Sequence, residues 1–230
     1  MTTWTYSDLN TKVRQDMGIT YENFISATEM RGYFKEAVRK LEKLIHGTYE
    51  DYFLAHQTVT LVNGTAEYDL ASDIFVNKIR YVLYANGTTI YPIKKLRGEH
   101  KFYDAEQRNL NDSGAYYKYL IKNRNVTDGV KLQLFPAAYE SGAYITIWYL
   151  RKLNELTSDS SVFDAPEFVD YVINFVKLRC SVKEHDTVLM QARNIALKEC
   201  EKELNNTLEN MIPDGDNEIL PDMAIYDDMV

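Results

Sequence analysis

The sequence of 230 residues is poor in the features that mark several protein classes. Its two cysteines, Cys180 and Cys200, are too few for a disulfide framework, so we expect free thiols in a core. No apolar run approaches the about 20 residues that a membrane span needs, and Met1 to Tyr6 lack the basic and apolar regions of a signal peptide. We therefore expect a protein that folds in the cytoplasm and has no membrane partner.

Motifs of catalysis and cofactor binding are lacking too. The sequence has no glycine-rich phosphate loop, no dinucleotide fingerprint, no Gly-x-Ser-x-Gly elbow and no His-Glu-x-x-His pair. The histidines stand apart from other ligand residues at metal-binding spacing: His46, His56, His100 and His185. We therefore expect no catalytic residue, no cofactor and no metal. The less favoured alternative is an enzyme with a dispersed site, drawn from a polar loop that contains His100, Asp104 and Glu106.

Basic residues are outnumbered, with 26 against 34 acidic ones and a net charge of -8. A protein that grips nucleic acid over its whole surface should be basic, so we expect no specific DNA binding. Most of the excess lies in residues 212–230, which have no Lys or Arg and carry Asp214, Asp216, Glu218, Asp222, Asp227 and Asp228. The rest of the chain is close to neutral, with 28 acidic and 26 basic residues.

Tyrosine, by contrast, is abundant, with 18 residues. Many of them fall in the segment that predicts strands: Tyr81, Tyr84, Tyr91, Tyr103, Tyr116, Tyr117, Tyr119, Tyr139, Tyr144 and Tyr149. Tyrosine is common both in β cores and at protein contacts, and we keep both interpretations open. Stacking of nucleic-acid bases is a weaker third interpretation, because nearby Arg and Lys residues would have to interleave with the rings.

Two helices are predicted before residue 50. Ser7 is a candidate N-cap, and Gly18 is suited to the left-handed position that closes the helix. Ser26 and Glu29 have the spacing of a capping box. From Met30 the apolar residues recur every three or four positions to near Gly47, which predicts an amphipathic helix.

The period changes to that of strands between Gln57 and Arg151. Three turn dipeptides, Asn63-Gly64, Asn86-Gly87 and Asp128-Gly129, each predict a β-hairpin. The expected pairs are residues 58–62 with 66–70, 79–84 with 89–93, and 116–121 with 130–135, and residues 144–149 form a further strand. These runs predict an antiparallel sheet or small barrel of about seven strands, with residues 97–114 as its long polar loop.

A polar linker, residues 154–164, leads back to helical periodicity. Asp164 and Pro166 predict the start of a third helix, and Asp186 with Thr187 predict the start of a fourth that ends before Pro213. The predicted class is α+β, a four-helix bundle with an inserted antiparallel β subdomain and an extended C-terminal arm. The expected parts are helices in 1–56 and 153–211, the β subdomain in 57–152 and the acidic tail in 212–230.

The order of several short motifs resembles the adaptor proteins of tailed bacteriophages. They are Ser7 to Leu9, Tyr33 to Leu41, Ala66 to Leu70 leading to Ile74–Tyr84, Leu132 to Pro136, Ile145 to Arg151, and Asp164 to Phe168. The resemblance covers residues 7–211, although the third-helix region lacks the alanine-rich run of many members and the acidic tail carries no family motif.

The resemblance implies a structural head-to-tail connector of the virion neck. Such a subunit forms a homo-oligomeric ring, a dodecamer, beneath the portal protein, contacts a downstream neck or tail protein, and extends the DNA channel. Another neck or tail role, such as tail completion or a gatekeeper, is the alternative.

The tail is the expected partner-binding segment. It is too interrupted by Pro213, Gly215 and Pro221 to continue a helix, and too apolar to serve only as a solvated tail. We expect it to bind the portal or a neighbouring subunit through its apolar side chains: Ile219, Leu220, Met223, Ile225, Tyr226 and Met229.

Overall fold

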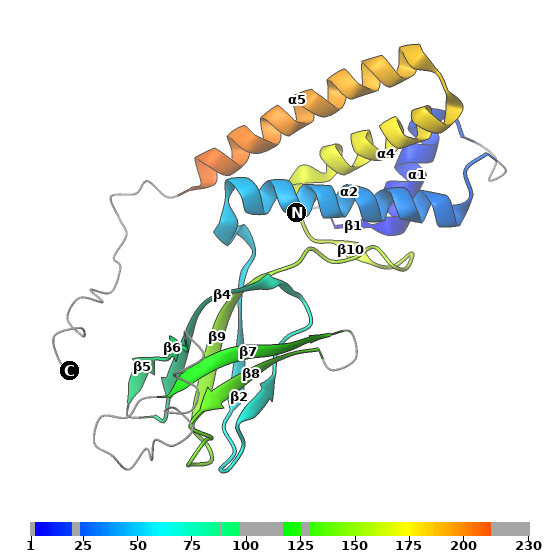
Figure 1. The fold of residues 1–230 in the computed structure, drawn as a ribbon. Helices are drawn as coiled ribbons and strands as arrows, with labels where there is room; N and C mark the ends of the chain where they lie inside the picture. Colours follow the sequence, from blue (N-terminus) through cyan, green and yellow to red (C-terminus); the bar gives the residue numbers. More distant parts are fainter. Residues whose placement is uncertain (1–2, 20–23, 88, 97–116, 126–128, 213–230) are drawn as a thin grey trace. The chain divides into compact units, whose positions relative to one another are not determined.

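The computed structural model describes residues 3–19, 24–87, 89–96, 117–125 and 129–212. Its class is α+β, with four α-helices and three small β-sheets in these residues, and none of the sheets closes into a barrel. The chain divides into two compact units (Figure 1). One unit contains the residues up to Glu50 and those from Leu153 onward, and the other contains Asp51–Lys152.

The first helix, α1, spans Tyr6–Met17 and begins two residues earlier than expected. Its N-cap is Thr5, whose side chain accepts a hydrogen bond from the Asp8 amide while the Asp8 carboxylate accepts one from the Thr5 amide. The prediction of Ser7 as N-cap is therefore wrong, because the N-cap of this capping box lies two residues upstream, at Thr5. Gly18 closes the helix in the left-handed conformation, as predicted, with a φ of 65°.

The second helix, α2, spans Ala27–Thr48 and confirms the capping box of Ser26 and Glu29. Its apolar side chains are buried at the spacing of one helix face: Met30, Phe34, Ala37, Val38, Leu41 and Ile45. A short 3-10 turn, η1, follows at Glu50–Phe53.

The third and fourth helices are α4, Val169–Glu184, and α5, Thr187–Met211. Asp186 caps α5 as predicted, accepting hydrogen bonds from the amides of Val188 and Leu189, both at 3.0 Å. Asp164 does not cap α4, which corrects the prediction. Its carboxylate accepts a hydrogen bond from the Asn154 amide at 3.2 Å, and a 3-10 turn, η2, Pro166–Phe168, precedes the helix.

Helices from the two ends of the chain pack together in this unit. The helix α4 contacts α1, α2 and α5, and α5 also contacts α2 (Figure 1). Accordingly, α4 is buried on several sides, whereas α5 buries only Leu197, Leu204 and Leu208 along its 25 residues. The helix α5 therefore keeps much of its surface free within the described chain.

The segment before α4, which the sequence predicts as a polar linker at residues 154–164, forms hydrogen bonds and ion pairs with α2. The Leu153 amide donates to the Glu42 carboxylate at 2.9 Å, and Asp159 pairs with Arg31 at 2.7 Å. Lys35, at 3.0 Å, holds the pKa of Glu155 below its ordinary value. Residues 162–163 also form strand β10, Val162–Phe163, which pairs with β1, Trp4–Thr5.

The β unit contains two four-stranded sheets. The first has the order β2, β9, β4, β5, with bounds Leu54–Thr60, Tyr144–Arg151, Ile74–Ala85 and Ile90–Pro92. The second has the order β3, β8, β7, β6, with bounds Glu67–Asp69, Gly129–Phe135, Lys118–Asn125 and Lys94–Lys95. Every pairing is antiparallel except that of β6 with β7. The barrel alternative is wrong, since neither sheet closes.

Two of the three predicted hairpins are confirmed. Strand β4 pairs with β5 across Asn86-Gly87, and β7 pairs with β8 on either side of residues 126–128. The hairpin across Asn63-Gly64 is wrong, because β2 pairs with β9 in the first sheet while β3 pairs with β8 in the second. The Asn63-Gly64 turn therefore carries the chain from one sheet to the other.

The core of the β unit is formed by side chains from both sheets. Its fully buried members include Leu61, Leu132, Ile145 and Ile147 together with several tyrosines. The predicted loop at residues 97–114 lies outside the described residues. No helix in the parts of the chain that the structure describes combines the length and apolar character of a membrane span.

Candidate functional site

The chemistry-bearing side chains of the described residues are dispersed. No three of their His, Cys, Asp and Glu side chains lie close enough together to hold a metal ion. His46 lies in the last turn of α2 and His185 caps the end of α4. His56 lies in β2, and the loop with His100, Asp104 and Glu106 lies outside the described residues.

The two cysteines are free thiols, as predicted. Burial raises the pKa of Cys180 to about 11, and it also raises the pKa of the half-buried Cys200. Cys200 accepts a hydrogen bond from the Asn174 side chain at 3.2 Å. Both thiols are therefore protonated at neutral pH and lack the thiolate character of a nucleophile.

The described tyrosines of the β unit include both buried core rings and exposed rings. Four rings form a chain of contacts in the β unit: Tyr91 stacks on Tyr84 at 4.7 Å, Tyr84 contacts Tyr117 at 5.3 Å, and Tyr117 stacks on Tyr139 at 5.6 Å between centroids. Tyr84 and Tyr117 are fully buried, whereas Tyr139 is 49% exposed. The chain of rings therefore connects the core with the surface.

Buried tyrosine hydroxyls in this unit find polar partners. The Tyr117 hydroxyl accepts a hydrogen bond from the Tyr139 amide at 3.2 Å, and the Tyr149 hydroxyl donates to Asp73 at 3.1 Å. Burial raises the pKa of both Tyr117 and Tyr149 to about 12. These tyrosines are neutral core residues, and Tyr119 is buried as well. Tyr103 and Tyr116 lie outside the described residues.

A row of aromatic rings crosses the outer face of the first sheet. His56 of β2 and Tyr81 of β4 both lie directly opposite Trp148 of the central strand β9. The ring of Trp148 is 4.9 Å from that of His56 and 5.5 Å from that of Tyr81, between centroids. His56 and Tyr81 are exposed and Trp148 is half-buried. We call these three residues the aromatic row.

A β-bulge places Tyr81 in this row. The register of β4 on β9 shifts between Ile79 and Tyr81, so that Arg80 is the extra residue. Ile79 and Val82 then both face the core, while Tyr81 faces outward beside Trp148. Arg80 pairs with Asp51 at 2.6 Å beside the row. Aromatic and Arg side chains on one surface are typical of protein contacts.

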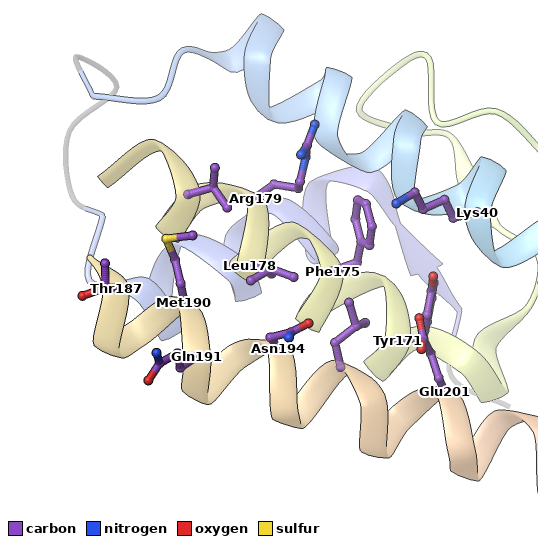
Figure 2. Close-up of a pocket in the computed structure, with 12 residues that line it drawn as sticks. Lys40, Tyr171, Phe175, Leu178, Arg179, Thr187, Met190, Gln191, Asn194 and Glu201 are labelled. Atoms are coloured by element: carbon purple, nitrogen blue, oxygen red, sulfur yellow. The ribbon is translucent and has the colours of Figure 1, made fainter. Parts of the chain in front are cut away.

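A second candidate surface is a groove of about 590 Å³ among α2, α4 and α5. Its apolar floor is made of Tyr171, Phe175 and Leu197, which are buried. Lys40 and Glu201 lie with Tyr171 toward one end of the groove, and Thr187 and Met190 lie toward the other (Figure 2). We call this surface the α2/α4/α5 groove.

The side of α5 that faces away from its intrachain contacts also carries apolar side chains. Val188 and Ile195 are 73% and 59% exposed, and Ala192 lies between them at helical spacing. Their positions are about half a turn away from the buried Leu197 and Leu204. The packing of α5 on α2 and α4 therefore does not cover them. This α5 stripe is a third candidate contact surface.

The expected partner-binding residues lie in the part of the chain that the structure does not describe: Ile219, Leu220, Met223, Ile225, Tyr226 and Met229. The last described residues before this segment are Met211 and Ile212, whose side chains are 41% and 43% exposed.

Sequence reasoning missed both the aromatic row and the groove. Tyr81 was named as a candidate, but His56 and Trp148 lie 92 residues apart in sequence and meet only through the register of β2 on β9. The alternation of Tyr144, Thr146 and Trp148 on one strand face was the available signal. The groove depends on how three helices pack, which no local pattern encodes.

A comparison with protein families agrees with the resemblance that the sequence motifs indicate. The model of the SU10 adaptor protein family matches residues 4–218, nearly the whole chain. A comparison with curated proteins gives no match. The match includes all four helices and both four-stranded sheets. The chain therefore belongs to the SU10 adaptor protein family, a phage head–tail adaptor family, and its role is that of a structural adaptor.

Proposed function

We propose that this adaptor forms a dodecameric ring beneath the portal protein in the virion neck and extends the DNA channel toward the tail. The observation that carries the proposal is the family match over residues 4–218. The ring and its partners are inferred from the motifs of the sequence and from the surfaces described above. The protein folds in the host cytoplasm and acts in the virion.

Surfaces for a ring are available on both units. Closed rings built from one kind of subunit use head-to-tail contacts, in which two different faces of each copy meet. The aromatic row belongs to the β unit, and the α5 stripe belongs to the helical unit. We assign these two surfaces to contacts between neighbouring subunits or with the portal and the downstream neck or tail protein.

The charge of the chain suits a conduit for DNA. Outside residues 212–230 the acidic and basic residues number 28 and 26, so the body has little net attraction for phosphate. DNA can then pass through the lumen without being held, because each Lys or Arg contact with a phosphate would favour a stationary complex.

Electron microscopy of the purified chain mixed with its portal tests the proposal. We expect a ring of adaptor subunits retained on one end of the portal. A persistent monomer that does not associate with the portal would contradict the proposal, and co-purification with a tail completion or tail-tube protein alone would favour the alternative neck role.

The C-terminal segment is the proposed docking arm. We expect a chain truncated after Met211 to keep its helical far-UV circular dichroism but to lose portal association. The matched control is the full-length chain with Asp227→Asn and Asp228→Asn, which keeps the apolar side chains Ile219, Leu220, Met223, Ile225, Tyr226 and Met229. Undiminished portal association of the truncated chain would refute the arm and leave the ring proposal standing.

A further inference from the structure

The α2/α4/α5 groove combines an apolar floor with charged side chains at its edge. Its floor of Tyr171, Phe175 and Leu197 is apolar, and exposed Val182 extends this apolar surface along α4. At its edge the Nζ atom of Lys40 lies 4.8 Å from the centroid of the Phe175 ring. Lys40 forms no ion pair with any carboxylate in the described parts of the chain. The groove therefore offers an apolar floor and, among the described residues, a cation that forms no ion pair.

The chain itself supplies a segment of matching chemistry. Residues 213–230 follow directly on α5, the helix that forms one wall of the groove. They combine six acidic side chains with a larger number of apolar ones and contain no Lys or Arg. An acidic and apolar segment complements a groove with an apolar floor and, at its edge, a Lys that forms no ion pair with the described carboxylates.

The residues after α5 predict a reversal of chain direction. Ile212-Pro213-Asp214-Gly215 has the residue types of a tight turn, with Pro preset for its second position and Gly free to adopt a positive φ. A turn at this point sends the following residues back along α5, toward its first half. The groove lies along that first half, from Thr187 to Glu201.

The length of the segment fits this path. The distance along α5 from Met211 back to Glu201 is about 15 Å, and the distance back to Thr187 is about 36 Å, at 1.5 Å per helical residue. An extended chain that starts at Asp216 covers these distances in about 5 and 11 residues, at about 3.3 Å per residue. Residues 221–227 would then lie along the groove, with Asp222 close to the Lys40 end.

We propose that the α2/α4/α5 groove of the free subunit is occupied by the C-terminal segment 213–230 of the same chain. The apolar side chains of the segment cover Phe175 and Leu197, and its carboxylates neutralise Lys40. This inference goes beyond the proposed function, because it concerns the subunit before any partner binds.

Disulfide trapping in the full-length chain tests the proposal. In a Cys200→Ala background, Asn194→Cys places a thiol in the groove and Ala224→Cys places one in the segment. We expect a disulfide within one chain to form about tenfold faster than in the matched control, because docking holds the two positions at bridging distance. The control pairs Ala224→Cys with Glu199→Cys, an exposed position on another side of α5.

A charge reversal in the same trapping variant tests the role of Lys40. Adding Lys40→Glu to the trapping variant should slow disulfide formation about two- to fivefold, the range expected for an exposed ion pair. Lys43→Glu makes the same charge change on α2 outside the groove and should leave the rate unchanged.

Three outcomes overturn the proposal. Equal rates for the groove pair and the control pair mean that the segment does not occupy the groove. Disulfides between two chains, with a rate that rises with protein concentration, assign the groove to a second copy. Equal effects of Lys40→Glu and Lys43→Glu on the rate of disulfide formation mean that Lys40 does not pair with the carboxylates of the segment. The experiment uses the free subunit, so its failure leaves the test with the portal unaffected.

Discussion

Val76 has a backbone conformation that valine rarely adopts. Its φ is 46°, and the φ of the next residue, Asn77, is 57°. Both lie in β4, where the register on β9 shifts between Ile74 and Ile79. Asparagine accepts the left-handed region readily, whereas a β-branched side chain is strained there. Val76 is 52% exposed, so burial of its side chain offsets little of that strain.

We therefore predict that Val76→Asn stabilises the β unit. Relief of the strained conformation should raise the free energy of unfolding by about 1 kcal/mol. Urea denaturation in a Trp4→Phe background measures this, because Trp148 on the neighbouring strand β9 then reports as the single tryptophan. Val62→Asn, at a position 54% exposed and without a positive φ, should change the stability by less than about 0.5 kcal/mol. Equal effects of the two substitutions on the free energy of unfolding would show that backbone strain at Val76 does not cause the stabilisation.

At the scale of single elements, the start of α2 is held by charge as well as by its cap. The Glu29 carboxylate accepts hydrogen bonds from Lys183 of α4 at 2.6 Å and from the Ser26 amide at 3.0 Å. The Lys183 contact contributes most to lowering the pKa of Glu29 from 4.5 to about 2. Glu29 therefore both caps α2 and connects it to α4.

This pKa shift predicts a pH dependence of stability. Because the pKa of Glu29 is lower in the folded chain than in the unfolded one, ionised Glu29 stabilises the fold above pH 4.5, and this contribution is lost as the pH falls through about 2. Glu29→Gln keeps the capping geometry but removes the ion pair. We expect a lower thermal midpoint than wild type at neutral pH, with the difference closing between pH 4.5 and 2.

Thermal unfolding followed by far-UV circular dichroism across this pH range checks the prediction. The matched control is Glu199→Gln at an exposed position of α5 that has no ion pair within the described residues. Its difference from wild type should stay the same at every pH. A Glu29→Gln difference that does not close toward pH 2 would assign its effect to the cap alone.

Element starts and ends were predictable where a few neighbouring residues decide them. The capping box of Ser26 and Glu29, the cap at Asp186 and the left-handed Gly18 each depend on contacts within four residues. Ser7 and Asp164 failed because a better partner was available: Thr5 already pairs with Asp8, and Asp164 binds the Asn154 amide. Competing local hydrogen bonds of this kind are hard to rank from sequence.

Strand pairing was predictable only where the turn determines it. Asn86-Gly87 joins two strands that pair with each other, but Asn63-Gly64 joins strands that pair with β9 and β8. The latter pairings connect residues far apart, such as Thr58 with Thr146, and depend on which face each strand buries. The aromatic row of His56, Tyr81 and Trp148 follows from the same long-range register and was therefore invisible to local patterns.

At the scale of the whole molecule, the excess acidic charge lies outside the two candidate contact surfaces of the described residues. Six of the 34 acidic residues lie within residues 212–230, while the aromatic row and the α5 stripe lie in the nearly neutral remainder. The proposed function requires firm contacts with protein neighbours and only weak contact with DNA. Apolar and aromatic contacts serve the first need, since their strength does not depend on salt as phosphate contacts do.

This separation predicts weak binding to DNA both with and without the acidic segment. At a net charge of -8 the full chain should bind duplex DNA with a Kd weaker than about 10⁻⁴ M at physiological salt. A chain that lacks residues 213–230 has six fewer acidic side chains and a net charge of -2. This charge is still negative and therefore does not attract phosphate. We therefore expect it to bind duplex DNA equally weakly in a fluorescence anisotropy titration over a range of salt concentrations.

The opposite outcome is a Kd of the shortened chain below about 10⁻⁶ M with a steep salt dependence. Its body would then carry a basic face that the acidic segment screens. That result would contradict the proposed neutral conduit for DNA.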